Sequence, residues 1–226
     1  MTLNGFKTEK SFCYENGFYA CADDRRFGKF FAHYELYKKI INLPGDIVEC
    51  GIFKGNSFFR LAHFRNILET QHSRKIIGFD MFGKFPATHF EADKKLREGF
   101  IAEAGDGIAL EEMKRILSHK KITNYELIQG DINLTLPQYC VENPQLKIAF
   151  LHIDTDIYEP AVTILESLYD KVVRGGIIAF DDYGTFPGET KAADDFLADK
   201  AESLQKLPIS HIPSFLIKSQ IPYPTL

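Results

Sequence analysis

Residues 147–184, KIAFLHIDTDIYEPAVTILESLYDKVVRGGIIAFDDYG, contain two apolar runs that both end on acidic residues. The run Ile148–Ile153 ends at Asp154, and the run Gly176–Phe180 ends at the pair Asp181–Asp182. Between the runs, apolar residues recur at steps of three and four, which predicts a helix. A strand, a helix and a second strand form a right-handed crossover, so we expect the two runs to lie parallel in one sheet.

The acidic ends of these two strands are expected to meet at one edge of the sheet. Open α/β sheets bind ligands at the carboxyl ends of their strands. The carboxylates of Asp154, Asp181 and Asp182 would repel one another there unless a cation lies among them. The sequence therefore predicts a divalent metal ion at this edge.

Composition narrows the class of protein. The chain has 226 residues, of which 45% are hydrophobic and 26% charged, as is typical of one soluble globular domain. A formal charge of −4 argues against a general nucleic-acid binder. The sequence shows no signal-peptide pattern and no run of about eighteen apolar residues, so we expect a cytoplasmic protein with no membrane partner. The four cysteines form no C-x-x-C pair, which favours reduced thiols over disulfides or a zinc site.

The N-terminal segment, residues 1–43, is predicted to form a helical cap. Residues 26–43, RFGKFFAHYELYKKIINL, carry aromatic and aliphatic side chains at helical spacing. A helix that covers the sheet is the favoured interpretation. The alternatives are a helix that caps the substrate and an interface between copies of the chain, as in a homo-oligomer. The preceding pair Arg25–Arg26 is expected at the surface or against a phosphate.

A glycine-containing turn follows the first predicted strand, Asp46–Cys50. The turn reads Gly51-Ile-Phe-Lys-Gly55 and leads into a helix at Ser57. Glycine lets the backbone approach a ligand closely, and a helix start can hold a carboxylate. Since this spacing is not G-x-G-x-x-G, it suits an amino-acid-bearing nucleoside better than a pyrophosphate, although a plain strand-to-helix turn explains it equally well.

Two further strands are predicted to end on acids. Residues 75–79 lead to Asp80, which is placed to accept both hydroxyls of a ribose. Residues 125–129 lead to Gly130–Asp131, where the aspartate either accepts a hydrogen bond from an adenine amino group or is a simple turn residue. Residues 81–107, between these strands, are longer than most connections and are predicted to form a lid.

The last part of the chain predicts a helix around residues 189–201 and a closing hairpin. Two short apolar runs, 204–209 and 214–217, are separated by His211-Ile-Pro213 and are expected to pair antiparallel. His152 lies inside a predicted buried strand and is interpreted as a core histidine. No repeat or second domain is indicated, so residues 1–226 are expected to form a single domain.

Five blocks in register resemble the macrocin O-methyltransferase (TylF/MycF-type) family. They are GDIVECGIFKGNSF (45–58), GFDMFGKFP (78–86), GDINLTLP (130–137), FLHIDTDIYEP (150–160) and RGGIIAFDDYG (174–184). This resemblance implies a class I methyltransferase, a Rossmann-like doubly wound α/β fold with a seven-stranded sheet and a C-terminal antiparallel hairpin. It also implies an enzyme that uses S-adenosylmethionine and Mg²⁺ to methylate a hydroxyl of a sugar or sugar nucleotide.

The resemblance assigns roles to individual positions of this chain. The magnesium ligands match Asp154, Asp181 and Asp182. The S-adenosylmethionine site matches the loop residues Glu49, Gly51, Phe53, Gly55, Asn56 and Ser57, the ribose acid Asp80, and the adenine-side residues Gly130 and Asp131.

The expected reaction requires a group that removes the hydroxyl proton, and we assign this role to Asp154. Asp156 is the competing base, although capping of the following helix is its favoured role. Two other functions fit less well. A catechol-type methyltransferase would share the fold and the metal, whereas an NAD-binding oxidoreductase is disfavoured by the missing G-x-G-x-x-G pattern.

Overall fold

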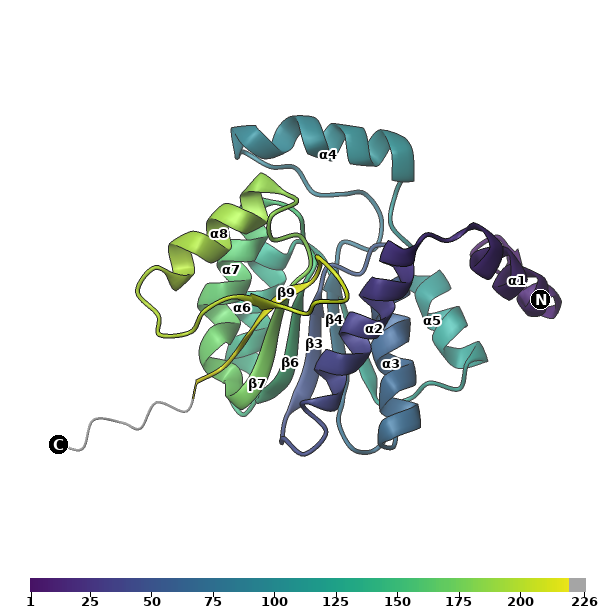
Figure 1. Cartoon of the computed structure of the whole chain (residues 1–226), viewed down its shortest axis with the longest axis horizontal. Helices are drawn as coiled ribbons and strands as arrows, with labels where there is room; N and C mark the ends of the chain where they lie inside the picture. Colours follow the sequence, from purple (N-terminus) through teal and green to yellow (C-terminus); the bar gives the residue numbers. More distant parts are fainter. Residues whose placement is uncertain (220–226) are drawn as a thin grey trace.

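The computed structural model describes residues 1–219, in which a seven-stranded sheet lies between two layers of helices (Figure 1). The strands of this sheet are β3 (Asp46–Cys50), β4 (Ile76–Asp80), β5 (Tyr125–Gln129), β6 (Ile148–Ile153), β7 (Val172–Phe180), β8 (Gln205–Lys206) and β9 (Ser214–Ile217). The helices are α1 (Ser11–Cys21), α2 (Asp24–Lys38), α3 (Asn56–Leu68), α4 (Glu91–Ala104), α5 (Leu110–His119), α6 (Ile132–Glu142), α7 (Tyr158–Leu168) and α8 (Pro187–Leu197). A two-stranded ribbon, β1 (Thr2–Leu3) with β2 (Phe6–Lys7), and 3-10 turns at Thr8–Lys10 and Tyr169–Lys171 complete the described chain.

The strand order of the sheet is β5-β4-β3-β6-β7-β9-β8. The first five strands of this order are parallel, whereas β9 runs antiparallel to β7 and β8 antiparallel to β9. The predicted doubly wound sheet and its C-terminal hairpin are therefore confirmed. Because the chain turns outward in opposite directions from the neighbours β3 and β6, the crevice for a ligand lies beyond their carboxyl ends.

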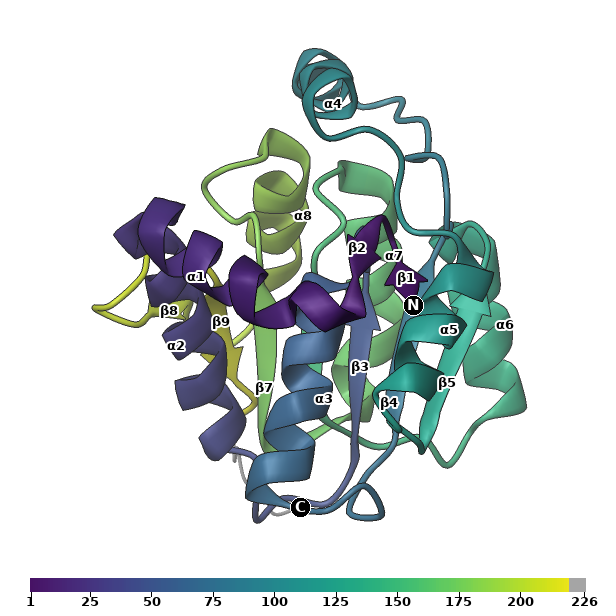
Figure 2. The same cartoon turned by 90° about the vertical axis from the view of Figure 1, so that its right-hand side faces the viewer.

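Each face of the sheet carries its own apolar core. Helices α2, α3 and α5 cover one face of the sheet (Figure 2). Their buried side chains include Leu36, Phe58 and Leu117. Helices α6, α7 and α8 cover the other face with side chains such as Leu136 and Ile164. The strand β6 is buried along its whole length, as expected for a central parallel strand covered on both faces.

Several element boundaries differ from those predicted. Helix α2 begins at Asp24 because the Asp23 carboxylate accepts from the N–H of Arg25 (3.0 Å) and of Arg26 (3.4 Å), and it ends at Lys38, before the predicted Leu43. Strand β7 begins at Val172, four residues earlier than predicted, and β8 spans two residues. Helix α8 begins at Pro187, since proline suits the first turn of a helix.

The predicted lid contains a helix. Residues 81–107 include α4, which lies over the carboxyl edge of the sheet and apart from both helix layers (Figures 1 and 2). Helix α1 projects from the body of the molecule and has no buried residue. Among residues 1–219, no helix combines the length and the apolar character that a membrane span requires.

Candidate functional site

A cavity of about 460 Å³ opens at the carboxyl edge of the sheet, beyond β3 and β6. Its lining includes the turn after β3, acids at the carboxyl ends of the four strands β4, β5, β6 and β7, and basic side chains from α2 and α3. The predicted site residues among them are Gly51, Phe53, Asn56, Ser57, Asp80, Asp131, Asp154, Asp181 and Asp182. Glu49, Gly55 and Gly130, which were predicted to bind the cofactor, are not among the lining residues.

The turn after β3 depends on two glycines. Gly51 has φ +91°, and a Cβ there would lie 1.8 Å from the carbonyl oxygen of Asp154, so only glycine allows the turn to approach the end of β6. Gly55 has φ +87° and precedes the first turn of α3. The N-terminal turn of α3, with its free N–H groups, therefore lies at the cavity beside the buried Ser57.

Asp80 holds the rim of the cavity together. Its Oδ2 accepts from the N–H of Ile52 (2.7 Å) and of Phe53 (3.1 Å), and its Oδ1 accepts from the N–H of Phe82 (2.5 Å). The acid predicted to bind ribose thus joins the turn after β3 to the start of the 81–107 segment. Asp131 lines the cavity and also caps α6, because its carboxylate accepts from the N–H of Asn133 (2.9 Å).

An acidic cluster forms one wall of the cavity. One carboxylate oxygen from each of Asp154, Asp156 and Asp182 lies within 4.8 Å of the other two. Burial raises the pKa of all three carboxyls, that of Asp156 to about 7, and the neighbouring carboxylates add to the increase. The strands therefore bring two of the predicted metal ligands together with Asp156.

The preferred interpretation of Asp156 as a helix cap is wrong. The residue that precedes the first turn of α7 is Ile157, whose own side chain makes no capping hydrogen bond. Asp156 has φ +63°, and its carboxyl is hydrogen-bonded to that of Asp182. The left-handed conformation of Asp156 places its side chain in the acidic cluster, and spacing alone does not reveal such a conformation.

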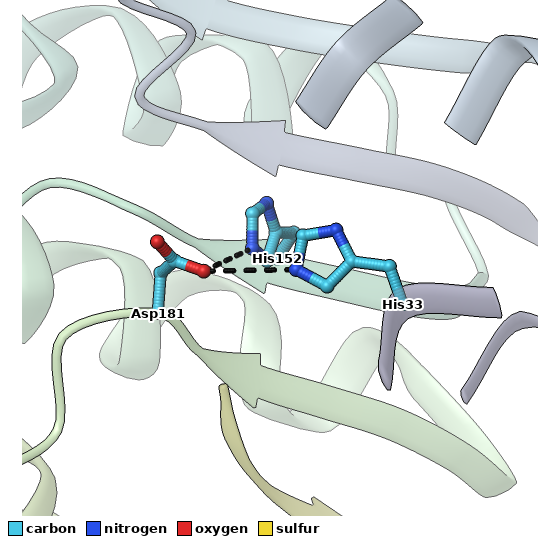
Figure 3. Close-up of side chains that lie close together, drawn as sticks. All are labelled: His33, His152 and Asp181. Atoms are coloured by element: carbon cyan, nitrogen blue, oxygen red, sulfur yellow. Dashed lines mark hydrogen bonds and ion pairs between the residues drawn. The ribbon is translucent and has the colours of Figure 1, made fainter. Parts of the chain in front are cut away.

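Asp181, the third predicted ligand, lies beside this cluster with different partners. Lys29 of α2 forms an ion pair with Asp181 Oδ2. Two histidines face the other oxygen: Nε2 of His152 lies 3.3 Å and Nε2 of His33 lies 3.6 Å from Asp181 Oδ1 (Figure 3). Burial alone would raise the pKa of Asp181, but the charge of Lys29 and the histidine contacts hold it well below its usual range.

His152 is buried, as predicted, but its surroundings are polar. Its Nδ1 lies 3.2 Å from Oε1 of Glu49, and both side chains are fully buried. Burial would lower the pKa of His152, but the carboxylates of Asp181 and Glu49 raise it to about 10. Glu49 therefore lies behind the cavity wall, where it contacts this histidine.

Charge balance indicates that the acidic wall suits a cation. Four aspartates line this part of the cavity: Asp154, Asp156, Asp181 and Asp182. Within residues 1–219, only Asp181 among them forms ion pairs. Behind Asp182, the buried Glu189 accepts from the N–H of Asp182 through Oε1 (2.9 Å), and its Oε2 has no hydrogen-bond partner among the described residues. Clustered carboxylate oxygens with so little compensating charge are the donor set that Mg²⁺ and similar hard cations prefer.

Helix α4 is attached to the rest of the site by two acids. Asp93 of α4 is buried and accepts from the N–H of Tyr158 (3.0 Å) and of Gly188 (2.7 Å), at the starts of α7 and α8. Glu159 of α7 accepts from the N–H of His89 (2.7 Å) and of Phe90 (3.0 Å). The predicted lid is thereby held next to the acidic wall.

Two curated proteins are similar to this chain in sequence. A demethyldecarbamoylnovobiocin O-methyltransferase of Streptomyces niveus is 28% identical over 173 residues, which are 70% of this chain and 60% of that protein. An 8-demethyl-8-(2,3-dimethoxy-alpha-L-rhamnosyl)-tetracenomycin-C 4'-O-methyltransferase of Streptomyces olivaceus is 26% identical over 146 residues, 62% of this chain and 54% of that protein. The match thus spans less than two thirds of the length of both curated relatives.

Solved structures extend the comparison to the fold. The calicheamicin methyltransferase CalS11 superposes with a TM-score of 0.72 at 26% identity, covering 94% of this chain and 86% of CalS11. CalS11, which has also been solved in its apo form, is described as a TDP-rhamnose 3'-O-methyltransferase. The O-methyltransferase NovP superposes with a TM-score of 0.74 at 23% identity, covering 85% of this chain and 80% of NovP, and it supports the class I methyltransferase fold.

The family follows from the extent of the sequence match. Residues 25–215 match the sequence model of the family described as Macrocin-O-methyltransferase (TylF). These residues run from the start of α2 to β9 and include the whole acidic wall and the turn after β3. The chain therefore belongs to the macrocin-O-methyltransferase (TylF) family.

Proposed function

We propose that this chain transfers a methyl group from S-adenosylmethionine to a hydroxyl of a sugar with the help of a divalent cation such as Mg²⁺. One observation carries the proposal: the acidic cluster of Asp154, Asp156 and Asp182 and the turn after β3 line the same cavity. A cation site and a donor site would then lie side by side, as the reaction requires.

The donor is assigned to the part of the cavity formed by residues 51–57, Asp80 and Asp131. The N-terminal turn of α3 offers free N–H groups to a carboxylate, Asp80 is the last residue of β4, where a ribose acid is expected, and Asp131 follows β5 on the adenine side. Glu49, Gly55 and Gly130 do not line the cavity, and they would affect donor binding by fixing the conformation of these turns.

The cation is assigned to Asp154, Asp181 and Asp182, which line the cavity. When bound, such an ion supplies Lewis-acid stabilisation of negative charge on the acceptor oxygen. The acidic wall would in addition orient the acceptor hydroxyl toward the donor methyl, and α4 above it would exclude water.

Methyl transfer from a sulfonium is an in-line displacement in which the new O–C bond forms as the C–S bond breaks. The hydroxyl proton must leave as well, and we assign it to the carboxylate of Asp154 at the end of β6. Asp156 is the second candidate, because its carboxyl lies in the same cluster and lines the same cavity.

A sugar acceptor is supported by the names of the relatives. One acts on a rhamnosyl-tetracenomycin and another is described as a TDP-rhamnose 3'-O-methyltransferase. Arg26, Lys29, Lys54, Arg60 and Lys84 line the cavity of this chain and provide positive charge that suits a phosphate-bearing acceptor as well as the donor carboxylate.

The test is incubation of the purified chain with labelled S-adenosylmethionine, a panel of TDP-linked and free deoxysugars, and a catechol, each with and without Mg²⁺. We expect Mg²⁺-dependent label on a sugar, a loss of about a hundredfold or more in Asp182→Asn, and no loss in Asp195→Asn, whose carboxylate pairs with Lys191 on the surface. Label on the catechol alone would favour the phenol methyltransferase. Calorimetric binding of NADH in place of S-adenosylhomocysteine would favour the oxidoreductase.

A further inference from the structure

Five buried or half-buried polar side chains form a line of contacts from the cavity lining into the sheet. It begins at Arg60 on α3, passes through His33 on α2 to Asp181 after β7, and continues through His152 on β6 to Glu49 on β3. His33, Asp181, His152 and Glu49 are each at most 2% exposed. Four of the five residues lie outside the catalytic and metal-binding set.

The partners of the two histidines fix where their protons lie. A guanidinium can only donate, so Nδ1 of His33, which lies 2.9 Å from Nη1 of Arg60, accepts that hydrogen bond. The proton of His33 is therefore on Nε2, which faces Asp181 Oδ1 at 3.6 Å. Both ring nitrogens of His152 face carboxylate oxygens, Glu49 at 3.2 Å and Asp181 at 3.3 Å, and both therefore donate.

The two carboxylate oxygens of Asp181 have different partners. Oδ1 faces Nε2 of both histidines on the buried side of the carboxylate (Figure 3). Oδ2 is the atom that pairs with Lys29, a side chain that lines the cavity. The hydrogen bond from His152 and the packing of the His33 ring against Oδ1 limit rotation of the carboxylate, so that Oδ2 is the oxygen left for the cavity.

The same three side chains also have the composition of a transition-metal site. One ligand atom from each of His33, His152 and Asp181 lies within 4.8 Å of the others. Metal ligation needs a free lone pair on each Nε2. The contact with Arg60 leaves the proton of His33 on Nε2, and the contacts with Glu49 and Asp181 leave a proton on each nitrogen of His152. Neither Nε2 then has a free lone pair, so the arrangement opposes ligation of a metal by the two rings.

We propose that His152, supported by His33, is a positioning residue that holds Asp181 so that a single oxygen faces the divalent cation. This inference rests on the cation site of the proposed function. Hydrogen-bonding partners behind metal ligands orient them, and removing such a partner typically lowers metal affinity by about 10- to 100-fold. The effect on this chain should appear in cation binding itself, before any turnover.

The experiment is a Mn²⁺ titration followed by electron paramagnetic resonance on the full chain with S-adenosylhomocysteine present. We expect the Mn²⁺ dissociation constant to rise about tenfold or more in His152→Leu. His152→Gln, which keeps one donor, should recover part of the affinity. His63→Leu on α3, whose ring contacts Lys120 outside the line, is the matched control and should bind as the wild type does.

A second variant covers a failure of His152→Leu to fold. His33→Gln removes the longer of the two contacts on Asp181 Oδ1 and should raise the dissociation constant by a smaller factor. Folding is checked by thermal unfolding without Mn²⁺. If His152→Leu folds and binds Mn²⁺ as tightly as the wild type, the positioning role is overturned while the proposed function stands. If His152→Leu does not fold, the same result with folded His33→Gln overturns it.

Pulsed resonance separates positioning from ligation. We expect no ¹⁴N modulation from a directly bound imidazole in the wild type, because the rings act through Asp181. Strong ¹⁴N modulation that disappears in His152→Leu would overturn the proposal in favour of a histidine-ligated metal. A wild-type chain that binds no Mn²⁺ at all would overturn both this inference and the cation in the proposed function.

Discussion

Lys29 and Asp181, which are 152 positions apart in the sequence, form an ion pair that joins α2 to the carboxyl end of β7. The Asp181 side chain is 3% exposed and that of Lys29 is 23% exposed, so water screens the pair only in part. Burial would lower the pKa of Lys29, but the charges of Asp181 and Asp154 raise it above its ordinary value. In the absence of a metal ion, the ammonium group compensates part of the charge of the acidic wall.

Replacement of Lys29 by methionine should therefore destabilise the metal-free chain. Breaking a buried ion pair leaves one charge uncompensated, which costs about 3–5 kcal/mol of unfolding free energy. Mg²⁺ should restore more stability to Lys29→Met than to the wild type, since the ion supplies the missing charge. Urea unfolding with and without Mg²⁺ measures both effects.

Lys38→Met on the same helix is the control for this prediction. Lys38 pairs with Glu35 on the surface, where both side chains are more than 40% exposed. An exposed pair contributes about 0–1 kcal/mol, so little change is expected. Equal losses in the two variants would contradict the role given to Lys29.

Asp93→Asn should loosen α4. The carboxylate of Asp93 accepts from the N–H of Tyr158 and of Gly188, and an amide has one accepting oxygen in place of two. One N–H at the start of α7 or α8 then loses its partner. Hydrogen exchange across residues 91–104 should become faster, while exchange in β6 should not change.

Glu98→Gln, an exposed substitution in the same helix, should leave the exchange of α4 unchanged. Gly188→Ala should act as Asp93→Asn does, because a Cβ at this position would lie 1.9 Å from Asp93 Oδ2. Unaltered exchange in both Asp93→Asn and Gly188→Ala would show that these contacts do not hold the helix.

Asp156 should make the metal-free chain less stable as the pH rises. The pKa of Asp156 is about 7 in the folded chain, against an ordinary value of 3.8, so between these pH values the folded state retains a proton that the unfolded state has lost. Where the folded state binds more protons than the unfolded state, the unfolding free energy falls as the pH rises. The stability that the retained proton of Asp156 contributes at low pH is therefore lost by about pH 7.

The comparison of wild type with Asp156→Asn isolates this contribution. From pH 4 to 7.5 in EDTA, the wild type should lose unfolding free energy relative to Asp156→Asn, which has no proton to release at this position. Asp170→Asn, at a side chain that is 99% exposed, should follow the wild type. Parallel curves for wild type and Asp156→Asn would contradict the assigned titration.

Asp80→Asn should weaken donor binding. Asp80 accepts three N–H groups from residues 52, 53 and 82 with its two oxygens, and an amide group leaves at least one of them without an acceptor. We expect calorimetry with S-adenosylhomocysteine to show an affinity about tenfold lower. Asp106→Asn, at an exposed position of the 81–107 segment, should bind as the wild type does.

Much of the fold could be predicted because local patterns determine it. The strands 46–50, 125–129 and 148–153 were predicted with the observed bounds, since each apolar run ends at a distinct turn or acid. The acids Asp80, Asp154, Asp181 and Asp182 line the cavity as expected, because the carboxyl ends of parallel strands share one edge.

The remaining features depend on contacts between distant residues. Nothing local in the sequence relates Lys29 or His33 to Asp181, and no pattern places Glu189 behind Asp182. Asp156 has φ +63°, and its carbonyl oxygen accepts from the N–H of Glu189 in α8 (3.2 Å), a contact that the local sequence does not reveal. The sequence does show Asp156 two positions after Asp154, at the end of a strand. This spacing was a signal for the acidic cluster, and the interpretation of Asp156 as a helix cap was wrong.

The most direct test of the cation site is anomalous diffraction from crystals grown with Mn²⁺ and S-adenosylhomocysteine. The account predicts one anomalous peak within bonding distance of the carboxylates of Asp154, Asp181 and Asp182, with S-adenosylhomocysteine in the cavity beside it. Ordered carboxylates with no peak among them, in crystals that hold S-adenosylhomocysteine, would contradict it.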